Sequence, residues 1–313
     1  MGVLVYAKMQ IRKWHMKYQN RRLMKYELGG GTDAEVNLLL LAHSLEKGMG
    51  IPSPRPGFGY EKAKCLCTKL EEYIANGNDR SRFAFREGVS VLDAYIQYTD
   101  NDCSEFKDSF DKIKNTVKSS CSAGIKSCDA MSEIYRLLDK EQIEYFISSR
   151  HSIRSFEDKP VDETVLRDAI EMAIHAPSAC NRQPEKIYFT SDHIKSDQIK
   201  MLIPGNKGFE NEIFNWAIIT EDRCLFGLNE PLQWYVNGGI FLAYFVQSLH
   251  AYGIGSCIFQ IPATHENTPK LRALLSIPER EAIIAAVGLG YPEEKNKFLA
   301  AERRPVDEVL VKF

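Results

Sequence analysis

The sequence predicts an all-helical module followed by a domain of the α/β or α+β class. Between residues 35 and 138 the chain consists of helix-like segments separated by turn signals. After residue 140 short β-like runs alternate with helical segments. We therefore expect a helical module over residues 1–140 and a second domain over residues 141–313.

Residues 2–26 have the pattern of a basic amphipathic helix, with seven Lys or Arg, no acid and an apolar stripe on one face. We expect the stripe to pack on its own protein or on a sister subunit, and peripheral contact with a membrane surface is the alternative. The run Gly29–Gly31 ends this helix, because glycine reaches the left-handed conformation of a helix end.

Four further helices complete the expected module, over Glu35–Lys47, Lys62–Ala75, Arg80–Tyr98 and Ser104–Leu138. Three prolines in the loop 48–59 prevent regular structure after the first of them. The breaks after the next two are Asn76–Asn78 and Asp100–Asp102.

The second domain begins with a helix that reaches Ser149 and a helix over Thr164–His175. A long apolar helix is expected over Leu232–Tyr252. The β-like runs predict three strands, over Lys186–Thr190, Trp216–Thr220 and Ala282–Leu289.

Composition excludes several classes of function. The 40 basic and 42 acidic residues nearly cancel, and no base-reading module accompanies the basic segment, so nucleic acid is not an expected partner. The spacing Cys65-x-Cys67 lacks a second pair at zinc-finger distance, so we expect no metal. The eight cysteines lie in a chain without a secretory signal pattern, which favours the cytoplasm.

The segment Arg150–Phe156 (RHSIRSF) carries three donors at alternate positions, Arg150, Ser152 and Arg154. Alternate residues of an extended segment share one side, so these donors can hold a phosphate and a carbonyl oxygen together. His151 lies between them.

Three further segments carry polar or glycine-rich patterns. The stiff loop Ala176–Pro184 (APSACNRQP) presents the side chains of Ser178, Asn181 and Gln183, which suit the edge of a planar heteroaromatic ring. Gly253–Gln260 (GIGSCIFQ) is expected to close the long helix and to leave backbone N–H groups free for a ligand. The last is Gly288–Pro292, followed by Glu302–Pro305.

In this order and spacing, the four segments resemble the flavin-dependent nitroreductase family over residues 143–311. The resemblance implies an α+β fold with a central, mostly antiparallel sheet flanked by helices. The residue after Gln183-Pro184 departs from the family, which has tryptophan where this chain has Glu185. The module shares no flavin motif, although His43–Gly48 with Arg55–Gly59 resembles an extension seen on some family members.

The resemblance also implies a set of FMN contacts. Arg150 and Ser152 would hold the phosphate and ribityl chain, with Arg303 or Arg304 as a second phosphate ligand, and Arg154 would stabilise the negative charge of the reduced ring. An amide near the ring edge would come from Asn206 or Asn211. The full set of expected cofactor-binding residues is Arg150, His151, Ser152, Arg154, Pro177, Ser178, Asn181, Gln183, Asn206, Gly255, Ser256, Cys257, Gln260 and Arg303.

The family's loop corresponding to Pro177–Gln183 reaches the flavin of the other subunit, so the resemblance implies a homodimer. The implied activity is a two-step cycle, in which NAD(P)H reduces FMN and a nitroaromatic or quinone-like acceptor then takes the electrons. No residue is assigned as a catalytic acid or base, because hydride transfer to a flavin needs none. The alternative function is a flavin-binding or scaffold protein whose helical half mediates partner or membrane-surface association.

Overall fold

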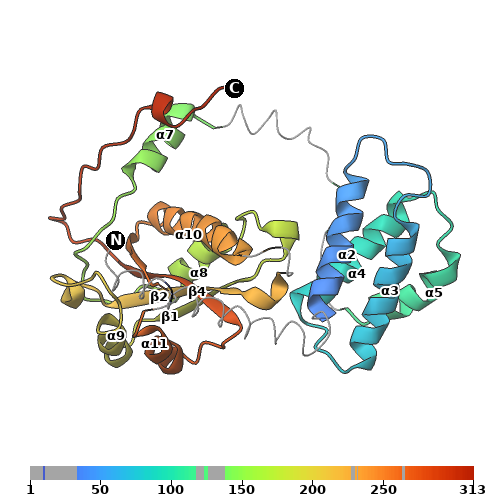
Figure 1. Ribbon diagram of the computed structural model, residues 1–313, viewed down its shortest axis with the longest axis horizontal. Helices are drawn as coiled ribbons and strands as arrows, with labels where there is room; N and C mark the ends of the chain where they lie inside the picture. Colours follow the sequence, from blue (N-terminus) through green and yellow to red (C-terminus); the bar gives the residue numbers. More distant parts are fainter. Residues whose placement is uncertain are drawn as a thin grey trace.

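The computed structural model describes residue 10 and residues 34–117, 123–125, 138–226, 230, 232–262 and 265–313. Within these residues the chain forms a cluster of helices beside a domain built on one β-sheet (Figure 1). The basic segment 2–26 and the glycine run after it lie outside the described residues. No described helix is long and apolar enough to cross a lipid bilayer.

The helical module contains four described helices, α2 (Ala34–Met49), α3 (Tyr60–Ala75), α4 (Phe83–Tyr98) and α5 (Ser104–Lys114). Apolar side chains spaced three or four residues apart on each helix enter one core, which includes Leu38, Leu45, Leu66 and Leu92. This apolar spacing explains why the first three helices agree closely with their predicted ranges.

The prediction of one helix from Ser104 to Leu138 is wrong in extent, because α5 ends at Lys114. The N–H of Asn115 donates to the carbonyl oxygens of Asp111 and Ile113, which closes the last turn. Residues 115–117 (NTV) then have low helix propensity. Residues 118–122 and 126–137 lie outside the described residues.

The second domain is built on four antiparallel strands in the order β1-β2-β4-β3, which confirms the predicted α+β class. Three of the strands were expected, and β3 lies in the segment that was expected to close the long helix. The strand bounds are β1 (Glu185–Thr190), β2 (Asn215–Asp222), β3 (Gly255–Gln260) and β4 (Glu281–Gly290).

Helices cover both faces of the sheet. Helices α8 (Glu163–Ala173) and α10 (Gln233–Ala251) pack on one face, and α9 (His193–Lys200) and α11 (Thr268–Leu275) on the other. Alternate residues of β2 serve the two layers, with Ala217 and Ile219 facing α8 and α10 while Trp216 and Ile218 face α9 and α11. All eight residues of β2 are buried, as expected for a central strand.

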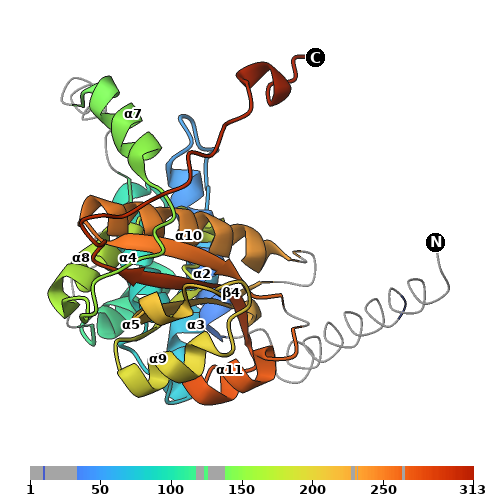
Figure 2. The ribbon, with the colours of Figure 1, turned by 90° about the vertical axis from the view of Figure 1, so that its left-hand side faces the viewer.

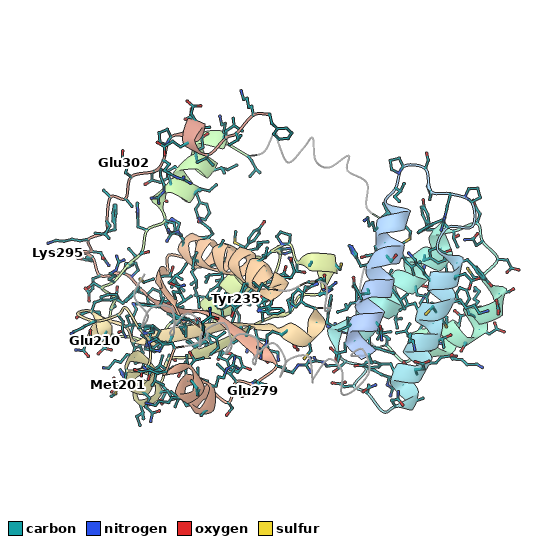
Figure 3. All side chains as sticks on the ribbon, in the orientation of Figure 1. Met201, Glu210, Tyr235, Glu279, Lys295 and Glu302 are labelled. Atoms are coloured by element: carbon teal, nitrogen blue, oxygen red, sulfur yellow. The ribbon has the colours of Figure 1, made fainter. Side chains whose placement is uncertain are left out.

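Two segments extend away from the sheet. Helix α7 (Lys140–Ser149) buries none of its residues, and the chain after β4 runs outward beyond α10 to the C-terminus (Figures 1 and 2). Lys295 and Glu302 lie along this outer segment (Figure 3). Its exposed apolar side chains include Phe298, Leu299 and Val309.

Candidate FMN site

The strand β3 brings together three of the four segments that the sequence analysis selected. Ser152 forms a parallel bridge with Ser256, and the N–H of Ile153 donates to the carbonyl oxygen of Ser256 at 3.0 Å. Phe156 forms an antiparallel bridge with Pro292, directly after β4. The segment 150–156 therefore contacts the outer edge of β3 through Ser152 and Ile153, and the chain after β4 through Phe156.

Gly255 permits this close approach of the chains. A Cβ atom at position 255 would lie 3.0 Å from side-chain atoms of both Ile153 and Pro292, which is tighter than ordinary van der Waals contact. Gly255 therefore allows β3 and the segment 150–156 to pack closely together.

The main-chain donors predicted for Gly255–Gln260 are presented by an edge strand. In an antiparallel strand, the N–H and C=O of one residue point to the same side, and successive residues alternate. Because the Ser256 carbonyl faces Ile153, the N–H groups of Ile258 and Gln260 also face away from β4. These two N–H groups can bind a ligand without disturbing the sheet.

A pocket of about 370 Å³ opens beside these donors. Its walls come from the segment after Ser152, the loop after α9, and β3 with its following loop. The lining residues include Arg154, Gly205, Phe209, Cys257, Ile258 and Gln260.

Arg154 supplies the positive charge of this pocket. Its guanidinium lies 5.7 Å from the ring centroid of Phe209 and donates to the Ser152 carbonyl oxygen at 3.4 Å. In the part of the chain that the structure describes, no carboxylate forms an ion pair with Arg154. Its charge is therefore available for an anionic or electron-rich ligand.

The Cys257 thiol of β3 lies within reach of two positive charges. Burial raises the pKa of the Cys257 thiol, while Arg154 and Arg150 act in the opposite direction. The thiol packs in the core between the sheet and α9 and α11. Arg150 also lowers the pKa of His250, although burial is the larger cause. Both guanidiniums therefore lie near the same stretch of the sheet.

The loop Pro177–Gln183 lies apart from the Arg154 pocket. It contacts the helical module, where the side-chain amide of Asn181 donates to Glu87 Oε1 at 3.3 Å. Within the loop, the Gln183 N–H donates to Ser178 Oγ, and the Gln183 amide donates to Asn181 Oδ1. One chain therefore does not bring these residues together with Arg154.

The other residues that were expected to contact FMN also have partners within the chain. Asn206 donates its amide to the Lys200 carbonyl oxygen at 2.7 Å, and Asn211 accepts from the Lys200 ammonium at 3.0 Å. Arg303 lies on the exposed C-terminal segment and donates to the Ala301 carbonyl oxygen. His151 stacks on Phe298, with ring centroids 4.0 Å apart.

The structure adds pocket residues that the sequence did not indicate. Pro204, Pro262 and His265 line the pocket next to the expected residues. His265 Nδ1 accepts the N–H of Asn267 at 3.2 Å, so this histidine also organises the turn before α11. A solitary histidine in a loop carries no sequence pattern that could have identified it.

Known proteins resemble this chain in the same region. A sequence model of the Nitroreductase family matches residues 147–218. The NADH dehydrogenase of Thermus thermophilus is 28% identical over 194 residues, which cover 52% of this chain and 91% of the relative. The FMN reductase (NAD(P)H) of Bacillus subtilis is 27% identical over 165 residues, 48% of this chain and 66% of the relative.

A solved FMN-dependent nitroreductase from Clostridium difficile R20291 aligns with 54% of this chain and 96% of its own chain, at 22% identity and a TM-score of 0.44. The family match spans the segment 150–156, the loop Pro177–Gln183, the strand β1 and the first half of β2. The domain that holds the sheet and the Arg154 pocket is therefore similar to proteins of the nitroreductase family.

Proposed function

We propose that this protein binds FMN and uses NAD(P)H to reduce a small electron acceptor, such as a nitroaromatic or a quinone. The observation that carries the proposal is the pocket in which the Arg154 guanidinium and the edge of β3 meet. The relatives named NADH dehydrogenase and FMN reductase (NAD(P)H) support the same reaction class.

The pocket residues fit an isoalloxazine ring. The walls of the pocket combine apolar surface from Phe209 and Ile258 with the outward N–H groups of Ile258 and Gln260. A flat heteroaromatic ring needs this combination, because its faces are apolar and its edge carries hydrogen-bonding atoms. Bound FMN would supply the hydride chemistry, by accepting hydride from NAD(P)H and passing electrons to the acceptor.

Each residue then has a defined task. Arg154 holds a fixed positive charge where negative charge develops during hydride transfer, which lowers the barrier electrostatically. The outward N–H of Gln260 orients the ring edge. Arg150 and Ser152, which precede Arg154 along the sheet edge, are suited to the phosphate and ribityl chain, with Arg303 as an additional phosphate ligand.

We also propose a homodimer that forms through α10. Its outer face carries exposed apolar side chains, with Val236 55% and Tyr244 43% exposed, and Leu232 directly before the helix is 54% exposed. Tyr235 also lies on this helix (Figure 3). Such a stripe on a 19-residue helix favours a protein partner over solvent.

The two adjacent glycines of α10, Gly238 and Gly239, face different surroundings. A Cβ atom at Gly238 would lie 2.6 Å from Ile284, so this glycine is needed for packing on its own sheet. A Cβ atom at Gly239 would meet nothing within 4 Å. Gly239 is therefore the residue of the pair that would allow close approach of a second subunit.

The dimer would also explain why Asn181 lies apart from Arg154 within one chain. The loop Pro177–Gln183 would then complete the site of the partner, and the exposed apolar segments α7 and 293–313 would cover its surface. A cytoplasmic location, and membrane contact through residues 1–26, remain predictions.

The test is an absorbance spectrum of the purified protein, followed by chromatography of the released cofactor and titration with NADH and NADPH. We expect flavin absorbance, FMN as the released compound, and bleaching by at least one nicotinamide. FAD is not expected, because the chain has no Gly-x-Gly-x-x-Gly dinucleotide loop. A colourless protein that does not take up added FMN would contradict the proposal and favour the scaffold alternative.

A further inference from the structure

The loop Ser178–Gln183 has a strained backbone. Cys180 and Asn181 both have φ of 53° and Gln183 has φ of 47°, in the left-handed region that favours glycine. Non-glycine residues rarely adopt this region, because their Cβ atom lies too close to the following carbonyl oxygen, so the surrounding structure must hold the loop in place.

The sheet domain supplies one set of anchors. Arg182 is only 4% exposed and forms an ion pair with Glu230 at 2.8 Å. It also donates to the Leu225 carbonyl oxygen at 3.0 Å and lies 5.5 Å from the ring centroid of Phe226. These contacts fix the C-terminal half of the loop.

The helical module supplies the other anchors. Ala179 packs against the core of that module, which also takes in Leu225 and Phe226 from the sheet domain. Helix α2 contacts the short turn at residues 179–181. From α4, Glu87 Oε1 accepts the amide hydrogen of Asn181 at 3.3 Å. The loop is therefore held between the two parts of the chain.

Glu87 lies in a partly desolvated group of charges. Burial raises the pKa of its carboxyl, and the nearby carboxyl of Glu46 on α2 raises it further, whereas Asn181 and Arg86 act in the opposite direction. Glu46 belongs to the motif His43–Gly48, which has no counterpart in flavin chemistry. This part of the motif therefore lies near the contact between the helical module and the loop Ser178–Gln183.

We propose that Glu87 is a positioning residue for Asn181, so that the helical module sets the conformation of a loop that contacts FMN. The inference rests on the proposed function, because it assigns Asn181 to the cofactor. An ionised carboxylate is a stronger acceptor than a neutral one. FMN affinity should therefore fall as the pH drops through the range in which Glu87 becomes protonated.

The charged groups around Glu87 define this pH dependence. Glu46 on α2 and Arg86 on α4 face it from the module, and Asn181 faces it from the loop. Because the pKa of Glu87 lies above its ordinary value, the change should occur at higher pH than for an exposed glutamate. Replacing Glu87 by glutamine should leave an acceptor but remove the titration.

The test uses the full chain with the substitutions Glu87→Gln and Glu87→Leu, and Glu61→Leu as a control at an exposed glutamate on α3. FMN dissociation constants are measured between pH 5 and pH 8 by quenching of flavin fluorescence. Hydrogen exchange is measured on peptides that cover residues 178–183.

We expect Glu87→Leu to weaken FMN binding by about tenfold at pH 8 and to speed exchange in the loop. Glu87→Gln should bind FMN with a smaller loss and without the wild-type pH dependence, while Glu61→Leu behaves as wild type. Unchanged affinity and exchange in Glu87→Leu would overturn the inference. If Glu87→Leu does not fold, a wild-type pH profile in Glu87→Gln would overturn it.

Failure of the proposed function would look different. A wild-type chain that binds no FMN would refute the flavin site, whereas the exchange data would still decide whether Glu87 holds the loop. Unchanged exchange in that case would overturn the positioning role as well.

Discussion

Glu221 should make the protein less stable as the pH rises. This residue lies on the α10 face of β2 and is fully buried, and among the residues that the structure describes none donates a hydrogen bond to its carboxylate oxygens. Burial raises its pKa to about 9, with further contributions from Glu185 and Asp222. Glu185 pairs directly with Glu221 across the sheet.

Glu281 provides an internal contrast on the opposite face of the sheet. It is equally buried, but Lys186, Thr220 and Tyr188 all donate hydrogen bonds to it. Although burial acts to raise its pKa, these donors hold the pKa below its ordinary value. The hydrogen-bond donors around each carboxyl, and not burial alone, therefore decide whether the folded state favours its protonated or its ionised form.

The size of the effect follows from proton linkage. Between the unfolded pKa near 4.5 and the folded pKa of about 9, the folded chain holds one more proton at Glu221 than the unfolded chain. Raising the pH therefore favours unfolding, by about 1.4 kcal/mol per pH unit from this group. Between pH 6 and pH 8 the loss should be about 3 kcal/mol.

The assay is urea unfolding followed by circular dichroism at pH 6, 7 and 8. The substitution Glu221→Gln keeps the shape of the side chain and removes its titration, so the free energy of unfolding should depend less on pH by about 1.4 kcal/mol per unit. The control is Glu171→Gln, at an exposed glutamate on α8. The same pH slope in wild type and Glu221→Gln would refute the reasoning.

Three other experiments test the site and the module. Arg154→Ala should slow reduction by NAD(P)H and lower the flavin potential while FMN still binds. The reduced ring should lose stabilisation on the order of 2 kcal/mol. An unchanged potential in spectroelectrochemistry would remove Arg154 from this role. Arg150→Ala and Asn181→Ala chains, refolded together, should recover up to about half the activity per hybrid dimer, because one site stays intact; no recovery would contradict a shared site. Gly48→Ala should destabilise the module by about 1–3 kcal/mol in thermal unfolding, relative to a Gly50→Ala control, because a Cβ atom would lie 1.9 Å from the Phe58 ring; equal stability of the two would show that the ring can move.

The sequence by itself determined the elements whose pattern repeats over many residues. Helices α2, α3, α4 and α10 were predicted within a few residues, because each keeps an apolar stripe through several turns. The strands β1, β2 and β4 were found from short apolar runs between turn signals. The order of four segments along the chain also indicated the nitroreductase resemblance, which the family match confirmed.

Local sequence could not identify elements whose pattern is short or mixed. The strand β3 begins with glycine and lies at an edge, so it carries no clean alternation. Helices α9 and α11 have eight residues each, too few for periodicity to separate them from loops. The early end of α5 depended on the local hydrogen bonds of Asn115.

Only the tertiary structure decided which polar residues meet. Arg154 and Gln260 lie far apart in the sequence, and the bridge between Ser152 and Ser256 brings them to one pocket. The same packing separated Asn181 from that pocket and placed it against Glu87. Periodicity reports which face of one element is buried, whereas contacts between elements depend on strand order and helix packing, which no local pattern encodes.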